Sequence, residues 1–336
     1  MRAMVLETIG SIDEAYDSLR PVDIPRPEPG DRELLIEVSA CGVCHTELDE
    51  IEGRTPPPEL PVVPGHEVVG RVVERGTDCH RHAIGDRVGV GWIHSSDGRE
   101  FENLSEAFCA TGRDANGGYA EYMTVPEDYA YPIPEVFSDA EAAPLLCAGG
   151  VGYRALRLTG IQNGQVLALT GFGGSGHLVL QLAKHLYPAS PVFVFARSTR
   201  EQQFARELGA DWAGDTEAEA PQLAHAFIDT TPVWKPVIAA LERLRPGGRL
   251  VINAIRKESV DRQLLAEISY EKHLWQEKEI KTVANVTHRD IAEFLPIAAR
   301  VPLRVETQTY ALEDANQALR DLKSGHIRGA KVLRVM

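Results

Sequence analysis

The stretch VLALTGFGGSGHLVLQLAKHL, residues 166–186, decides the fold of this chain. An apolar run ends at Thr170, and a GxGxxG pattern then leads directly into a segment with helical apolar spacing. A strand that turns through glycines into a helix is typical of a dinucleotide-binding βαβ unit, in which the glycines allow a tight turn, a close approach of the pyrophosphate and close helix packing. We therefore expect cofactor contacts along the turn, from Gly171, Phe172, Gly173, Gly174, Ser175 and Gly176.

The segments after this stretch continue the alternation of strand and helix. Apolar runs predict strands at 192–196 (VFVFA), 226–230 (AFIDT) and 249–253 (RLVIN), and REQQFARELGA at 200–210 predicts a helix. Strands that alternate with helices indicate βαβ units and a parallel sheet with right-handed crossovers.

Residues 1–149 have a different rhythm. Short Val-rich or aromatic segments, each bounded by Gly, Pro or Asp, predict strands at 34–40, 68–74, 86–92 and 119–125. This pattern is typical of a barrel-like or sandwich fold. From residue 287 onward the pattern returns to a mixture of helix and strand.

Composition excludes several classes of function. The net charge of −14 argues against a nucleic-acid partner and against an anionic membrane surface, since both require clustered Lys and Arg. No stretch reaches the about 18 apolar residues of a membrane-spanning helix, and the N-terminus lacks the pattern of a signal peptide, so we expect a cytoplasmic protein. The five scattered cysteines do not suggest a disulfide framework, which leaves metal binding or burial.

The end of the second predicted strand bears on the choice of cofactor. An NAD enzyme usually carries a carboxylate there, about 20 residues beyond the glycines. Here the strand ends in Phe195-Ala196-Arg197-Ser198, with no acid and an arginine beside a hydroxyl. Arg197 and Ser198 match a 2′-phosphate, so NADP(H) is favoured and NAD(H) stays possible. The alternative is that Arg197 is a solvated surface charge.

Cys44, His66 and Cys147 form a candidate metal-binding set. Zinc accepts thiolate and imidazole ligands, and a catalytic zinc site uses three protein ligands and keeps one position open. Their spacing is too wide for a closed structural site. Spacing alone leaves open that the cysteines are buried core thiols and that His66 is a hydrogen-bonded turn residue.

A set of motifs resembles those of zinc-containing medium-chain alcohol dehydrogenases, most closely the bacterial branch related to cinnamyl alcohol dehydrogenases. In chain order they are GVCHTEL, PxxPGHExVGxV at 61–72, GDRVGV, NGGYAEY, APLLCAG and GFGGSGH. The resemblance implies an α/β protein with a doubly wound Rossmann domain at 150–286. A β-rich GroES-like catalytic domain at 1–149 and 287–336 would enclose it.

The resemblance also implies roles for single residues. The matching family positions bind one catalytic zinc through Cys44, His66 and Cys147, the ligand set for which alcohol dehydrogenase is itself the standard example. Glu67 matches a neighbouring acid that can exchange onto the metal, and Thr46 matches the hydroxyl that takes the alcohol proton.

Further matches lie around this set. Glu47 stands where the family usually has Asp and would orient His66. His45 and Arg328 match contacts to the cofactor pyrophosphate, and Trp92 matches an aromatic residue that lines the substrate pocket.

Several positions depart from the family pattern. Many relatives hold a second, structural zinc with four cysteines, but here Ser105 replaces the last ligand and Cys109 is out of register, so we expect one zinc per chain. Asp49 stands where the proton relay often has a histidine, and the sequence does not decide whether it takes part. Cys41 is expected to be packed, and the cluster at 79–82 (CHRH) is expected to be a solvated loop.

The activity implied by the resemblance is hydride transfer between a nicotinamide cofactor and a primary alcohol or aldehyde, aliphatic or aromatic. The expected partners are this small molecule and other copies of the chain, in a homodimer or homotetramer. Two alternatives stay open: a zinc-free medium-chain reductase of enones or quinones, and a non-catalytic nucleotide-binding protein.

Overall fold

A computed structural model describes residues 1–13, 17–301, 303–325 and 329–336. These residues divide into two compact units: Met1–Cys147, Val286–Ala299 and Val305–Met336 form unit 1, and Ala148–Asn285 and Arg300–Arg304 form unit 2. Residues 300–304, expected in the catalytic domain, belong to unit 2. There the Gln181 side chain binds both the backbone N–H and the carbonyl of Arg304.

Unit 2 is built on a parallel sheet in the order β12-β11-β10-β13-β14-β15. This is the order of the doubly wound dinucleotide-binding fold, in which the chain starts at the middle and reverses direction across the sheet. The residues of β10 and β11 are all buried, as expected for strands covered on both faces. The strands are β10 (Leu167–Thr170), β11 (Val192–Phe195), β12 (Trp212–Gly214), β13 (Ala224–Asp229), β14 (Leu244–Ile252) and β15 (Glu279–Thr282).

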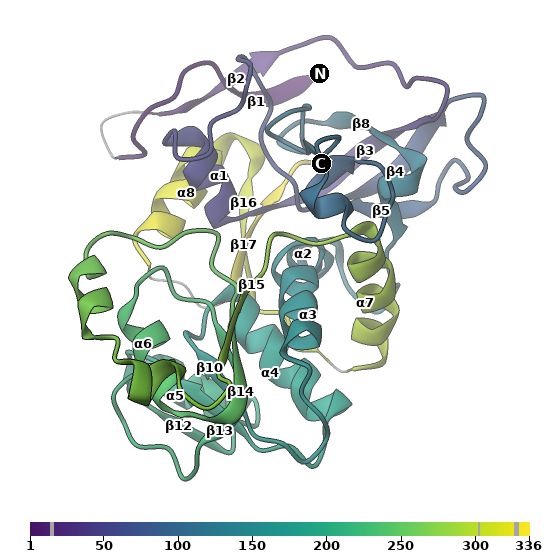
Figure 1. Ribbon diagram of the computed structural model, residues 1–336. Helices are drawn as coiled ribbons and strands as arrows, with labels where there is room; N and C mark the ends of the chain where they lie inside the picture. Colours follow the sequence, from purple (N-terminus) through teal and green to yellow (C-terminus); the bar gives the residue numbers. More distant parts are fainter. Residues whose placement is uncertain (14–16, 302, 326–328) are drawn as a thin grey trace. The chain divides into compact units, whose positions relative to one another are not determined.

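Helices of unit 2 pack on this sheet. Helices α3 and α4 lie side by side, with α4 against β10 and β11, and α6 lies against β10, β13 and β14 (Figure 1). The α3–α4 contact is close because a Cβ on Gly152 would lie 2.6 Å from Val179. The helical elements are α3 (Ala148–Thr159), α4 (Gly174–Leu186), α5 (Thr199–Glu207), α6 (Lys235–Glu242), η4 (Arg262–Glu267) and η5 (Tyr270–Leu274).

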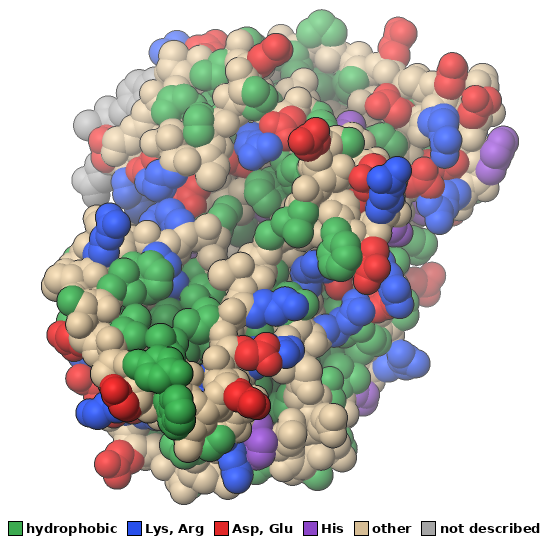
Figure 2. Space-filling view, in the orientation of Figure 1, with side chains coloured by type: hydrophobic (Ala, Val, Ile, Leu, Met, Phe, Trp, Pro, Cys, Tyr) green, Lys and Arg blue, Asp and Glu red, His purple; other side chains and the backbone are tan. Residues whose placement is uncertain are grey.

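A group of exposed apolar side chains lies on unit 2 between residues 255 and 280. Figure 2 shows green side chains gathered over this part of the molecule. Exposed apolar side chains gathered on one part of a surface are typical of a site that meets a partner. Its members are Ile255, Val260, Tyr270, Leu274, Trp275 and Ile280.

Unit 1 is β-rich. Its main sheet has the order β16-β17-β3-β4-β5-β9, and β8 also pairs with β3. The long strand β3 therefore organises the unit, since its two edges pair with β4, β8 and β17. The strands are β1 (Arg2–Leu6), β2 (Leu19–Asp23), β3 (Glu33–Val43), β4 (Val68–Arg75), β5 (Arg87–Val90), β6 (Ile93–Ser95), β7 (Cys109–Ala110), β8 (Tyr122–Pro126), β9 (Ala130–Pro132), β16 (Thr307–Ala311) and β17 (Ala330–Arg334).

Most helices of unit 1 are short, whereas α7 has 13 residues. Helix α1 follows β3 directly, and η3 ends at the residue before Cys147. The helical elements are α1 (His45–Ile51), η1 (Glu102–Leu104), η2 (Glu127–Tyr129), α2 (Asp139–Ala142), η3 (Ala143–Leu146), α7 (His288–Arg300), η6 (Leu312–Asp314) and α8 (Ala315–Lys323).

Candidate metal and dinucleotide sites

The junction of β3 and α1 carries Cys44, the first member of a group of possible metal ligands that also includes His66, Glu67 and Cys147. We call these four residues the metal group. Cys44 is the N-cap of α1, and its backbone N–H donates to Glu47 Oε2 at 2.8 Å. The other Glu47 oxygen, Oε1, lies 2.5 Å from His66 Nδ1. One carboxylate therefore caps the helix and holds the histidine, as the resemblance implied for Glu47.

His66 and Glu67 come from the segment just before β4. The backbone of Glu67 pairs with Gly42, whose N–H donates to the Glu67 carbonyl at 2.9 Å. A Cβ on Gly42 would lie 1.7 Å from Glu67 Oε2, so only glycine leaves room for this carboxylate. Glu67 thus fills the space beside β3 and points toward the group.

Cys147 completes the group at the end of η3. Its Sγ lies 3.9 Å from Cys44 Sγ, and one ligand atom from each of Cys44, His66, Glu67 and Cys147 lies within 4.8 Å of the others. Two thiolates bonded to one tetrahedral zinc at about 2.3 Å would have their sulfurs about 3.8 Å apart. The spacing of the two sulfurs therefore fits zinc.

The far nitrogen of His66 gives an independent test of that fit. His66 is fully buried, and its Nε2 has no hydrogen-bond partner. A buried polar atom without a partner is costly, and a histidine that gives one nitrogen to a carboxylate is the usual arrangement of a metal ligand. The residues present fit a metal ion bound through Nε2.

Within the protein alone, the electrostatics of the group favour the thiolate at Cys44 and the protonated forms of Cys147, His66 and Glu67. A hydrogen bond from the Cys147 thiol lowers the pKa of Cys44 well below its usual value, while the same contact raises the pKa of Cys147. Burial lowers the pKa of His66, but the Glu47 carboxylate and Cys44 outweigh it and raise that pKa well above its ordinary range. Burial, followed by the charge of Cys44, raises the pKa of Glu67. A divalent cation would relieve this concentration of negative charge.

Residues with proposed roles in proton transfer lie on α1. Thr46 is buried, with Oγ1 3.7 Å from Cys44 Sγ, so its hydroxyl lies beside the group. Asp49 is also buried, and its Oδ1 accepts from Arg54 Nε at 2.5 Å. Trp92, the predicted pocket-lining residue, has its ring centroid 6.2 Å from that of His66.

The glycine turn of unit 2 lies where the sheet order reverses, between β10 and α4. Gly171 has φ +80°, and a Cβ there would lie 2.7 Å from Thr230 Oγ1. A Cβ on Gly176 would lie 2.8 Å from the Gly171 carbonyl, whereas Gly173 has open space around it. Gly174 and Ser175 lie in the first turn of α4, where N–H groups are free to bind an anion. The geometry suits the three glycine roles expected from the sequence.

Other predicted cofactor residues differ in what they offer. The Phe172 side chain is buried against the ring of Phe204 at 5.6 Å, so it is a packing residue, and only its backbone could face a cofactor. Arg197 is exposed at the end of β11, and the Ser198 hydroxyl is engaged with Glu201 in the capping box of α5. His45 is exposed on α1. Arg328 lies outside the described residues.

Comparisons with known proteins place these observations in a family. Residues 30–135 match the alcohol dehydrogenase GroES-like domain. The chain is 41% identical to a protein of Mycobacterium tuberculosis named as a probable alcohol dehydrogenase, over 93% of this chain and 91% of that one. The chain belongs to the medium-chain alcohol dehydrogenase family. It is also 32% identical to an alcohol dehydrogenase of Geobacillus stearothermophilus, over 96% of this chain and 98% of the relative.

Relatives of the cinnamyl alcohol dehydrogenase branch also match. A protein of Populus deltoides named as a probable cinnamyl alcohol dehydrogenase is 35% identical, over 70% of this chain and 71% of its own. A cinnamyl alcohol dehydrogenase of Sorghum bicolor has the same fold, with a TM-score of 0.84 over 99% of this chain and 97% of that chain at 24% identity. This medium-chain alcohol dehydrogenase is thus related to the cinnamyl branch, as its motifs predicted.

Among the described residues, no helix is both long and apolar enough to cross a membrane.

Residues 93–110 correspond to the segment expected to bind a second, structural zinc in many relatives, and here the Glu102 carboxylate fixes this segment to the rest of unit 1. Glu102, in η1, is fully buried and accepts from the hydroxyl of Tyr129 at 2.9 Å. Its Oε1 is bound by both the backbone N–H and the ring Nδ1 of His288, the latter at 2.6 Å. Ser105 donates to Asp97 at 2.9 Å, and Cys109 is half-buried rather than fully buried. We call residues 93–110 the lobe.

The other cysteines of this alcohol dehydrogenase lie in packed positions. Cys41 is fully buried, as expected. In the cluster at 79–82, His80 and Arg81 are exposed, but Cys79 and His82 are buried, and the His82 ring is hydrogen-bonded to the Ala130 carbonyl. The expectation of a solvated loop was therefore wrong for half of the cluster.

Sequence reasoning missed buried charged groups in both units. In unit 2, Asp229 at the end of β13 is fully buried, accepts from Thr170 Oγ1 at 2.6 Å and forms an ion pair with Lys257. The signal was an acid at the end of an apolar strand. In unit 1, Glu50 on α1 is buried without a hydrogen-bond partner. Glu50 lies among other charged residues in the sequence ELDEIEGR, and such a segment does not predict a buried side chain.

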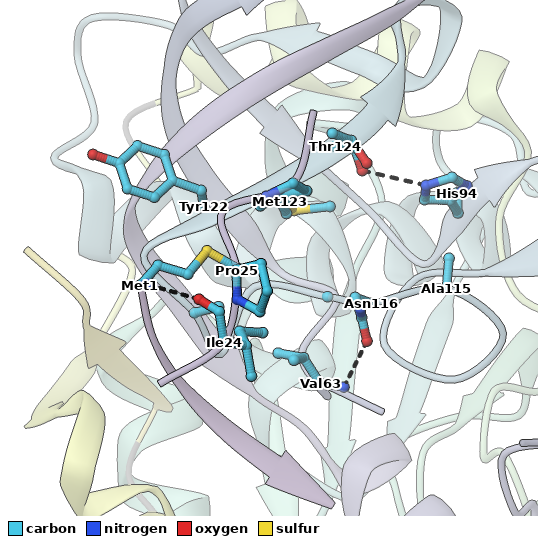
Figure 3. Close-up of a pocket in the computed structure, with 13 residues that line it drawn as sticks. Met1, Ile24, Pro25, Val63, His94, Ala115, Asn116, Tyr122, Met123 and Thr124 are labelled. Atoms are coloured by element: carbon cyan, nitrogen blue, oxygen red, sulfur yellow. Dashed lines mark hydrogen bonds between the residues drawn. The ribbon is translucent and has the colours of Figure 1, made fainter. Parts of the chain in front are cut away.

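A cavity of about 150 Å³ lies elsewhere in unit 1, and Figure 3 shows its lining. Apolar side chains from Met1, Ile24 and Pro25 meet His94, whose Nε2 is hydrogen-bonded to the Thr124 carbonyl at 3.3 Å. None of the predicted site residues lines this cavity. It is separate from the metal group.

Proposed function

We propose that this chain is a zinc-dependent alcohol dehydrogenase, or aldehyde reductase in the reverse direction, with one catalytic zinc held by Cys44, His66 and Cys147. Glu67 is the neighbouring acid that can exchange onto the metal. The observation that carries the proposal is the convergence of these ligand atoms within 4.8 Å around a buried His66 Nε2 that has no other partner. Unit 1 is then the catalytic domain and unit 2 the dinucleotide-binding domain.

The chain's own residues supply binding and proton transfer. Bound zinc acts as a Lewis acid on the substrate oxygen, and the nicotinamide cofactor carries the hydride. Thr46 Oγ1 would accept the proton of the substrate alcohol while its own hydroxyl proton passes to the cofactor ribose and then to water, and the reverse transfer would protonate the product of aldehyde reduction. Glu47 keeps the His66 ring in one tautomer and one orientation. The Asp49 carboxylate is held by Arg54, which favours a relay that does not pass through Asp49.

We propose NADP(H) as the preferred cofactor and place its 2′-phosphate beside Arg197. The strand end carries no acid, Arg197 is exposed, and a charge-assisted hydrogen bond to phosphate is worth about 1.5–3 kcal/mol. Arg197→Ala is expected to lower kcat/KM for NADPH about tenfold or more and to leave that for NADH nearly unchanged. A tenfold preference of the wild-type enzyme for NADH would contradict the assignment.

Metal content tests the main proposal without relying on activity. The purified protein is expected to hold one zinc per chain by elemental analysis, and Cys44→Ser is expected to lose both the zinc and the turnover of primary alcohols. Cys109→Ser is the matched control and should keep both. Two tightly held zinc ions per chain would contradict the one-zinc proposal.

Two outcomes would favour the alternatives. Turnover that survives chelation and the Cys44→Ser substitution would favour a zinc-free reductase of enones or quinones, a class represented among fold neighbours by a quinone oxidoreductase of Coxiella burnetii with a TM-score of 0.79. Binding of NADPH without turnover of any aliphatic, benzylic or cinnamyl substrate would favour a non-catalytic protein. The homodimer or homotetramer stays a prediction, and the exposed apolar patch of unit 2 supports it.

A further inference from the structure

Glu50 is a buried acid that the fold does not explain. It lies on α1, one helical turn beyond Thr46, and its side chain is 1% exposed. Both carboxylate oxygens are buried and have no hydrogen-bond partner among the described residues. A buried polar group without a partner costs about 1–3 kcal/mol, and a charged one more.

Two other acids close to Glu50 show that partners are available in this region. Asp49 is buried and binds Arg54, and Glu52 binds Arg54 and Lys323. Both of these side chains are held by basic groups. Glu50 lies on the same face of α1 as Thr46 and Asp49, because residues three and four apart are neighbours on a helix. Of the three acids, Glu50 is the one whose two carboxylate oxygens both lack a hydrogen-bond partner among the described residues.

The surroundings of Glu50 connect it to the metal group. Burial raises the pKa of the Glu50 carboxyl well above its usual range, and the nearby Glu47 charge raises it further. The charges of His66 and Arg113 and the Trp92 indole act in the other direction, so these groups lie close to the carboxyl.

Trp92 Nε1 is buried and makes no hydrogen bond of ordinary geometry. The Trp92 ring also lies 6.2 Å from that of His66, tilted by 53°. The guanidinium of Arg113 lies over the Trp92 ring and pairs with Asp114. Unsatisfied acceptors and an unsatisfied donor thus lie together, beside the proposed proton-transfer residue and the proposed metal ligand.

We propose that Glu50 binds a second hydroxyl group of the substrate, so that the enzyme prefers diols to simple alcohols. This inference rests on the proposed alcohol dehydrogenase function. A hydroxyl both donates and accepts, so one such group could satisfy a Glu50 oxygen and the Trp92 N–H together. Water could fill the same role, but only a substrate hydroxyl would couple Glu50 to specificity.

The helix sets the spacing of the two hydroxyls. Thr46 and Glu50 are separated by about 6 Å along the axis, from a rise of about 1.5 Å per residue. An extended four- or five-carbon diol spans this separation. Butane-1,4-diol and pentane-1,5-diol are therefore the substrates of choice, and butan-1-ol and pentan-1-ol are their matched partners without the second hydroxyl.

The experiment compares kcat/KM for each diol with that for its matched alcohol, using the zinc-loaded enzyme and saturating NADP. The wild-type enzyme is expected to favour the diol about tenfold or more, and Glu50→Leu is expected to abolish that preference. Glu50→Gln, which keeps hydrogen-bonding groups, should retain at least part of it. Glu52→Gln, at the C-cap of the same helix, is the matched control and should keep the wild-type ratio.

A thermal melt separates a substrate-binding role from a structural one. Replacing an unpartnered buried carboxyl by leucine is expected to raise the melting temperature of Glu50→Leu. A fall in that temperature would overturn the inference, as would a wild-type enzyme that turns over simple alcohols and diols equally or a Glu50→Leu variant that keeps the preference. Absence of turnover on every alcohol would instead overturn the proposed function, and the inference with it.

Discussion

Among the described residues of unit 1, two carboxylate–histidine pairs with a buried carboxylate use the same chemistry differently. In the metal group, Glu47 and His66 are both fully buried, and the far ring nitrogen of His66 faces two sulfurs without a hydrogen-bond partner. In the lobe, Glu102 is fully buried, but His288 is 40% exposed, and its ring stands edge-on to Tyr129. The carboxylate alone does not mark a metal site.

The two pairs differ in the hydrogen-bond partners of the carboxylate and of the histidine ring. Glu102 accepts from Tyr129 and twice from His288, so it joins the lobe to η2 and α7. Glu47 caps its own helix and leaves His66 Nε2 for a ligand. The Glu102–His288 pair therefore joins parts of the fold, whereas the Glu47–His66 pair leaves a ring nitrogen for the proposed zinc.

The largest expected effect separates the two histidines. His66→Asn should remove bound zinc and lower turnover of a primary alcohol about a thousandfold or more, since metal binding supplies several kcal/mol of stabilisation. His288→Asn should keep the zinc and stay within about threefold of wild-type turnover. Elemental analysis and steady-state kinetics measure both. Loss of zinc in both variants would break the comparison.

The next largest effect is expected from replacing the two carboxylates, Glu47 and Glu102, which should differ in their influence on zinc affinity. Glu47→Gln should weaken zinc binding about 10- to 100-fold, because it removes the charge that orients His66. Competition with a chromophoric chelator measures the affinity. Glu102→Gln serves as the control, and an equal loss of affinity there would contradict the division of roles.

Replacing Glu102, which is expected to leave zinc affinity unchanged, should instead lower the stability of the fold. Glu102→Gln weakens the charge-assisted bonds from His288 and Tyr129 and is expected to cost about 1–3 kcal/mol, which lowers the melting temperature by several degrees. Glu100→Gln, on the exposed surface of the same segment, should change stability by less than about 0.5 kcal/mol. Thermal melts of zinc-loaded protein test this, and equal shifts in the two variants would refute it.

The smallest expected effect comes from His94, a third histidine, hydrogen-bonded to a carbonyl rather than to a carboxylate. Burial lowers its pKa below the ordinary 6.5. The folded state therefore binds its proton less readily than the unfolded chain, and stability is lost as the pH falls below about 6.5 toward the lowered pKa. His94→Gln should lose about 1–2 °C less in melting temperature than the wild type between neutral pH and about pH 5.5. An identical loss would contradict this.

Much of the fold followed from the sequence because its signals were local. The strands around Val38, Val72, Leu169 and Val194 lie in apolar runs bounded by turn residues, and the glycine turn is a local motif. The exposed edge strand β15 was missed, since EIKT has no apolar run and its residues are all exposed. Propensity is weak where a strand is only an edge.

The candidate site was predictable only in part. Cys44 and Cys147 are 103 positions apart, and motif resemblance, not spacing, brought them together. The burial of Glu50 and Glu102 could not be foreseen, because acidic side chains are rarely buried and each lies in a polar segment. Their environments are made by distant residues such as Trp92 and His288, and no local pattern records those contacts.

The attachment of the lobe by Glu102 has a consequence for oxidative damage. A lobe held by thiolates would come loose when peroxide converted its cysteines to sulfenic or sulfinic acids, because the thiolate is the form that reacts. The groups that attach this lobe are the carboxylate of Glu102, the phenol of Tyr129 and the imidazole of His288, and none of them is oxidised by peroxide in the way a thiolate is. In this chain the low-pKa thiol is Cys44, so an oxidant should inactivate the proposed catalytic centre while the lobe stays in place. Oxidation that stops at the sulfenic acid or at a disulfide would then leave a folded protein whose activity a thiol reductant could restore.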